Sequence, residues 1–96
     1  MLPPQKTVTL AADNIRIVNK GDQRLSLAYW DQSAWQPLSI DVQGTTEIAC
    51  PKCAGTIIVV YHDGTQNQRT PLKAGGTYWI GWSSSRGAWL LTNPPN

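Results

Sequence analysis

The residues best suited to chemistry are two cysteines, Cys50 and Cys53, which flank a proline and a lysine in EIACPKCAG, residues 47–55. A Cys-x-x-Cys pair can form half of a zinc site, a redox pair or a short disulfide. Structural zinc requires four ligands, and the chain has one histidine, His62, and no second Cys-x-x-Cys. A metal site centred on Cys50 and Cys53 would therefore have to be shared across a dimer, with two cysteines from each chain.

A redox role for the same pair requires a thiol with a lowered pKa, which a helix N-terminus commonly provides. The residues that follow, TIIVVYH at 56–62, predict a strand instead. We therefore expect a Cys50–Cys53 disulfide and no cofactor, with reduced thiols, shared zinc and a redox pair as alternatives. Closing so short a loop stabilises the fold by about 2 kcal/mol in the chain-entropy model.

The tryptophans are the second group of candidate functional residues. The chain has five tryptophans and no phenylalanine, so some indoles must fill core volume while others can bind ligands. Strand alternation in TYWIGW, residues 77–82, places Trp82 on a core face and Trp79 on the opposite face. We expect two or three buried tryptophans and a ligand surface formed by Trp35, Trp79 and Arg86.

Conventional catalysis finds little support in the sequence. His62 and Asp63 are adjacent, and neighbouring residues of a strand point to opposite faces. WSSSRG, residues 82–87, lacks the strand-turn-helix setting of a nucleophile elbow. We therefore predict that the protein is not an enzyme.

The elements that must position these residues are strands. Turn residues interrupt the chain every 8–12 residues, and apolar and polar residues alternate between the turns. No internal repeat is apparent. The pattern predicts an all-β, single-domain antiparallel sandwich of about seven or eight short strands over residues 7–92, with flexible ends at 1–6 and 93–96. The segments that can form these strands, seven to nine in number, are 7–10, 14–20, 24–30, 37–42, 45–50, 56–62, 68–72, 77–82 and 88–92.

Several details of these strands are specific enough to check. Leu38, Ile40 and Val42 should point inward, and the segment 31–37 should be a loop that contains Trp35. Pro37 cannot donate a ladder hydrogen bond and belongs at an edge or a strand start. Residues 56–62 are apolar on both faces and should form a central strand, followed by a hairpin turn at Asp63-Gly64.

LKAGGTY, residues 72–78, resembles the tyrosine corner of fibronectin type III domains, whose pattern is Leu-x-Pro-Gly-x-x-Tyr. The resemblance implies an immunoglobulin-like sandwich in which Leu72, Gly75 and Tyr78 are structural, with the tyrosine hydroxyl bonded to upstream backbone. Residues 14–92 also look like small exported bacterial β-proteins of unassigned role. This second resemblance implies an extracytoplasmic domain.

Composition narrows the partners and the location. The net charge is +2 and no basic cluster is present, so we expect no nucleic-acid partner. No apolar run is long enough to span a membrane. Low charge and paired cysteines favour a periplasmic or secreted protein whose leader has been removed. We predict a monomer or weak homodimer with a non-catalytic binding or structural role toward a partner protein or glycan, the alternative being a thiol or metal protein.

Overall fold

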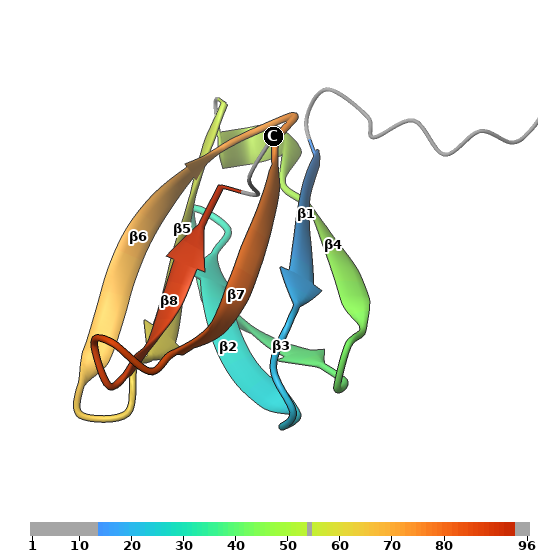
Figure 1. Cartoon of the computed structure of the whole chain (residues 1–96). Helices are drawn as coiled ribbons and strands as arrows, with labels where there is room; N and C mark the ends of the chain where they lie inside the picture. The colour runs from blue at the N-terminus through green and yellow to red at the C-terminus, as the bar shows by residue number, and fades with distance from the viewer. Residues whose placement is uncertain (1–13, 54, 94–96) are drawn as a thin grey trace, which may run out of the picture.

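The computed structural model describes residues 14–53 and 55–93, which form eight strands in two four-stranded sheets (Figure 1). The expected all-β class is confirmed, and the described residues contain no α-helix. The strands are β1 (Asn14–Asn19), β2 (Leu25–Trp30), β3 (Trp35–Ile40), β4 (Thr45–Ala49), β5 (Thr56–His62), β6 (Asn67–Lys73), β7 (Thr77–Ser83) and β8 (Ala88–Thr92). A short 3₁₀ turn, η1 (Pro51–Cys53), lies between β4 and β5.

One sheet has the order β4-β1-β7-β8 and the other has the order β3-β2-β5-β6. Three hairpins, β2–β3, β5–β6 and β7–β8, pair consecutive strands, and all pairings but one are antiparallel. The exception joins β1 to β7 in parallel, with Ile17 beside Tyr78. The loops that follow β1, β3, β5 and β7 gather at the lower end of the molecule in Figure 1.

The core lies between the two sheets and is mainly aliphatic. Each strand alternates, so that every second side chain enters this space. The buried residues of the first sheet include Ile15, Ile17, Ile48 and Ile80, and those of the second include Leu27, Ile40, Ile57, Val59 and Leu72. Alternation in residues 14–20 and 45–50 predicts that Ile15 shares a face with Ile17 and that Ile48 shares a face with Cys50, and all four are buried.

Three local predictions agree with the structure. β5 lies between β2 and β6, which is the central position that its two apolar faces indicated. Asp63 and Gly64 begin the β5–β6 hairpin loop, and Gly64 has a φ of 111°, which favours glycine. Pro37 lies on β3, an edge strand where a missing donor is tolerated.

The predicted boundaries of the strand at 37–42, which corresponds to β3, were wrong. Trp35 is the first residue of β3 rather than part of a loop, and the strand ends at Ile40. The chain then turns, with the Gly44 N–H donating to the Asp41 carbonyl at 2.8 Å. Val42 lies in this turn and is 49% exposed, so its predicted inward orientation is incorrect.

The burial of the tryptophans was also predicted incorrectly. Trp82 is 52% exposed, whereas its cross-strand partner Trp89 is 8% exposed and is the only buried tryptophan of the five. The Trp89 ring reaches beneath β7 as far as Gly21, where an added Cβ would lie 2.5 Å from two of its ring carbons. Because that ring fills the interior, Trp82 packs edge-on outside it, with centroids 5.8 Å apart.

The turn between β6 and β7 contains the residues of the tyrosine-corner pattern. Leu72 is buried and Gly75 has a φ of 85°. The Tyr78 hydroxyl accepts a hydrogen bond from the Lys73 N–H at 2.9 Å, so the side chain reaches back to upstream backbone.

Some predictions fall outside the described residues. The edge strand at 7–10, the segment 1–6 and the last residues, 94–96, belong to this group. No helix in the described part of the chain is long and apolar enough to cross a membrane.

Candidate functional site

The three predicted ligand residues do not come together in the structure. Trp35 projects from the outer face of the β3-β2-β5-β6 sheet, and Trp79 lies on the outer face of the other sheet. Arg86 lies in the turn between β7 and β8, where its N–H donates to the Ser83 hydroxyl at 3.3 Å. A single surface containing all three is therefore wrong, and each has to be considered in its own surroundings.

Trp35 is part of an apolar row that crosses its sheet from edge to edge. It pairs with Trp30, which pairs with Ile58, which in turn pairs with Pro71. The two indoles have centroids 5.2 Å apart and planes inclined by 59°. Together with Ile58 they line an open depression of about 290 Å³.

A cation borders this depression. The Arg69 guanidinium lies 5.4 Å from the centroid of the Trp35 ring, within the range of a cation–π contact. Arg69 belongs to the neighbouring outward row, whose other members are Pro37, Ala28 and Val60. None of the outward positions of these four described strands carries Asp or Glu, so the face is apolar at its centre and cationic at one side.

The loop between β2 and β3 fixes the two indoles relative to each other. Oδ1 of Asp31 accepts hydrogen bonds from the N–H groups of Ser33 at 2.8 Å and Ala34 at 2.7 Å. Its Oδ2 accepts one from the Gln36 side chain at 2.8 Å. These donors hold the pKa of the Asp31 carboxyl well below its usual range, with the Ala34 amide contributing most. The carboxylate therefore fastens the loop that directly joins Trp30 to Trp35.

The same arrangement recurs in the β5–β6 hairpin, which the sequence reasoning missed. Oδ1 of Asp63 accepts from Thr65 and Gln66 N–H groups at 2.8 and 2.9 Å, and Oδ2 accepts from the Gln68 side chain at 2.7 Å. The pKa of the Asp63 carboxyl is lowered for the same reason. Both loops carry Tyr-x-Asp-x-(Ser/Thr)-x-x-Gln, at 29–36 and 61–68, so the expectation of no internal repeat was incorrect.

Trp79 has different surroundings from Trp35. It is half-buried, and the Lys20 ammonium lies 4.7 Å from its ring centroid. Its cross-strand neighbours on the outer face are Val18 and Thr92. Lys20 covers part of this indole, so less of the ring is free to meet a ligand.

Cys50 and Cys53 form a disulfide across η1, with Cα atoms 5.4 Å apart, and both are buried. His62 lies at the far end of the seven-residue strand β5, about 20 Å from the start of that strand. Its Nδ1 accepts a hydrogen bond from the Gly64 N–H at 3.1 Å. Within the described residues no three His, Cys, Asp or Glu side chains are grouped as metal ligands.

Comparison of the chain with protein-family models, curated protein sequences and solved structures finds no match. The resemblances to fibronectin type III domains and to exported bacterial proteins remain predictions.

Proposed function

We propose that this chain is a non-catalytic, extracytoplasmic binding domain that holds an acidic polysaccharide against the indole depression. The observation that carries the proposal is a depression on a sheet face whose described outward positions carry no Asp or Glu. It is lined by Trp30, Trp35, Ile58 and Arg69. Indole rings offer flat apolar area to the C–H face of a pyranose ring, and Arg binds carboxylates through its planar fork. A uronic-acid residue combines the two groups that this depression complements.

The size of the face favours a glycan over a globular protein. Four strands spaced about 4.8 Å apart, with two apolar rows along them, cover a flat area of about 250 Å². A stable protein interface buries about 800 Å² of accessible surface on each partner, of which about 450 Å² is apolar. The apolar area is therefore too small for a standard protein interface but sufficient for a few sugar rings.

The finer assignments belong to the same proposal. We infer an immunoglobulin-like sandwich, since the hydroxyl of Tyr78 meets upstream backbone as a tyrosine corner requires. The Cys50–Cys53 disulfide serves as a staple at the junction of β4 and β5, and a disulfide is compatible with an oxidising compartment. This favours the periplasmic or secreted location and leaves the thiol or metal role as the less supported alternative.

The test is the affinity for polygalacturonate, alginate and hyaluronate, with dextran as the neutral control, measured by calorimetry. We expect binding of at least one acidic polymer and none of dextran. W35A should weaken binding at least tenfold, which corresponds to about 1.4 kcal/mol. R69Q should weaken it and flatten its salt dependence, since it removes the cation beside Trp35.

Matched variants on other surfaces separate this site from the rest of the molecule. K73Q removes another cation from the same sheet face, and W79A removes the half-buried indole of the opposite sheet. Both should bind as the wild type does. Equal binding of dextran, no binding of any acidic polymer, or full binding by W35A would overturn the proposal. A protein ligand whose binding W35A abolishes, found in place of glycan binding, would also overturn it.

A further inference from the structure

Trp82 is an exposed aromatic surface in a fixed position. Its side chain is 52% exposed, although it pairs directly with the buried Trp89 on the same face of the sheet. The two rings meet at 72° with centroids 5.8 Å apart, which is an edge-to-face contact. The buried ring thus supports the exposed one, and Trp82 presents apolar area to solvent at the loop end of the sandwich.

Beside Trp82 lies a cavity of about 520 Å³, within the range of small-ligand sites. Trp89 and Gly21 also line it, and the polar part of its wall comes from two loops, with Lys20, Asp22 and Gln23 after β1 and Gln43 after β3. The side chains of Asp22 and Gln23 form no hydrogen bond to another residue that the structure describes. Gln43 donates through Nε2 to the Gly21 carbonyl at 2.9 Å, and its side-chain oxygen accepts no hydrogen bond from the described residues.

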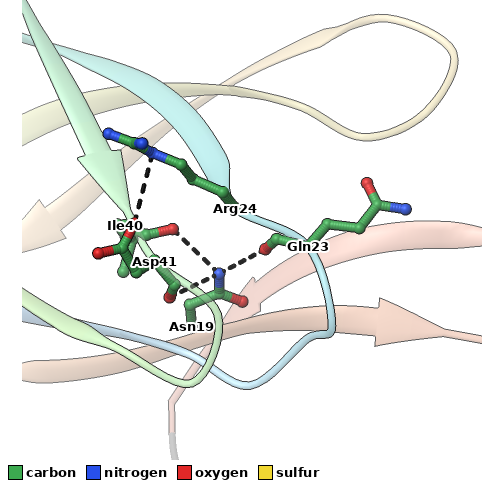
Figure 2. Close-up of polar contacts among 5 residues, drawn as sticks. All are labelled: Asn19, Gln23, Arg24, Ile40 and Asp41. Atoms are coloured by element: carbon green, nitrogen blue, oxygen red, sulfur yellow. Dashed lines mark hydrogen bonds and ion pairs between the residues drawn. The ribbon is translucent and has the colours of Figure 1, made fainter.

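A buried side chain holds these two loops together. The Asn19 amide donates to the carbonyls of Gln23 at 2.7 Å and Asp41 at 3.1 Å (Figure 2). Its oxygen accepts from the Gly21 N–H at 2.8 Å. Figure 2 also shows the Gln23 side chain directed away from these contacts. The backbone that carries the polar wall is therefore fixed before any ligand arrives.

We propose that this cavity is a second binding site, for an uncharged hexopyranose. Trp82 supplies the stacking surface, and Asp22, Gln23 and Gln43 supply acceptors and a donor for ring hydroxyls. Lys20 and Asp22 balance each other in charge, unlike the acid-free sheet face, so the cavity has no preference for an acidic sugar. The site lies at the loop end below β7, whereas Trp35 projects from the outer face of the β3-β2-β5-β6 sheet. It does not depend on the function proposed above.

The test is a titration of the ¹⁵N-labelled full chain with the methyl pyranosides of glucose, galactose, mannose and glucuronic acid, followed by NMR. We expect saturable shifts of the Trp82 indole N–H and the Gln43 side-chain amide with at least one neutral sugar. W82A should weaken binding at least tenfold, and D22N and Q43A should each weaken it severalfold. Because Trp82 is exposed, W82A should keep the dispersed spectrum of a folded chain.

W35A is the matched control, since it removes the indole of the sheet-face depression and should leave the neutral sugar's affinity unchanged. Loss of acidic-polymer binding in W35A alone, and of neutral-sugar binding in W82A alone, would establish two independent sites. No saturable shift with any of these sugars up to their solubility, or unchanged binding by a folded W82A, would overturn this proposal. So would a preference for glucuronic acid over the neutral sugars.

Discussion

Asn19 is the residue whose replacement should have the largest and best-defined effect on stability. Its side chain is fully buried and donates from Nδ2 to the carbonyls of Gln23, Ile40 and Asp41, at 2.7, 3.2 and 3.1 Å (Figure 2). In N19D the nitrogen becomes an oxygen that faces three carbonyl oxygens. The introduced carboxyl must then either repel them as a carboxylate or accept a proton.

The magnitude follows from the free energy of that protonation. An ordinary aspartate has a pKa of about 3.9, and each pH unit above it adds about 1.4 kcal/mol to the free energy of holding the carboxyl neutral, or about 4 kcal/mol at pH 7. The neutral carboxyl still offers one proton fewer than the amide, which costs about 1 kcal/mol. N19D should therefore lose about 5 kcal/mol at pH 7, out of the roughly 5–15 kcal/mol that stabilise a domain.

N19A provides the contrast. It removes the two Nδ2 protons, which three carbonyls share, and the oxygen that accepts from the Gly21 N–H, and it should lose about 3 kcal/mol at any pH. The carboxyl in N19D has a folded-state pKa raised above its unfolded value. The protonated carboxyl therefore makes its full contribution to the free energy of unfolding below about pH 4, and this contribution is lost as the pH rises toward 7. At pH 4.5 the deficit of N19D should fall to about 2 kcal/mol, below that of N19A.

Urea unfolding followed by tryptophan fluorescence, with each variant compared with the wild type at the same pH, measures these differences. The expected result is an inversion: N19D is the less stable variant at pH 7 and the more stable one at pH 4.5. A deficit for N19D that does not change with pH, or that stays below about 1 kcal/mol, would refute the assignment of Nδ2 as a buried donor to these carbonyls.

Three further predictions concern the loops. Reducing the Cys50–Cys53 disulfide should lower stability by about 2 kcal/mol and Tm by about 8–16 °C, and a fall below about 3 °C would contradict its role as a staple. G21A places a Cβ 2.5 Å from ring carbons of the buried Trp89 and should lower the free energy of unfolding, measured in urea, by about 1–3 kcal/mol. An unchanged urea midpoint would show that the loop moves to accommodate the methyl group and would contradict this prediction. The carboxylates of Asp31 and Asp63, whose pKa values are lowered in the folded state, stabilise the fold above about pH 4. This contribution is lost as the pH falls through the folded-state pKa values, so the free energy of unfolding of D31N/D63N should fall less steeply in acid than that of the wild type. Equal slopes for the two proteins would contradict this prediction.

Local features of the fold were predictable because they depend on neighbouring residues. The alternation of Ile15, Ile17 and Ile48 with polar residues reflects the two-residue period of a strand with one buried face. The turn at Asp63-Gly64 and the edge position of Pro37 follow from backbone chemistry that one or two residues determine.

Features that depend on distant residues were not predictable in this way. The parallel pairing of β1 with β7 is not encoded in the alternation of either strand. Alternation determines which face of a strand is buried, but not which strand lies beside it. The exposure of Trp82 is a similar case. Alternation correctly placed it on the same face as Ile80, but the interior at that end is already filled by Trp89, which comes from the next strand.

The repeated loop motif separates residues that both hairpins share from residues that differ between them. Ala28 and Val60 each precede the motif's tyrosine and pair directly with each other, so a local two-fold axis relates the β2–β3 hairpin to the β5–β6 hairpin. The tyrosine, aspartate and glutamine are shared, and both aspartates make the same contacts. The outward residues differ, because the positions of Trp30 and Trp35 in one hairpin are held by His62 and Asn67 in the other.

If the two indoles were needed to stabilise the hairpin, the copy with histidine and asparagine would need a substitute for them. That copy forms the same loop, with its carboxylate accepting at 2.8 and 2.9 Å from backbone N–H groups. Its two strands are paired over seven residues, compared with six in the first copy. The hairpin therefore does not require tryptophan at either position, which agrees with the ligand-binding role proposed for Trp30 and Trp35.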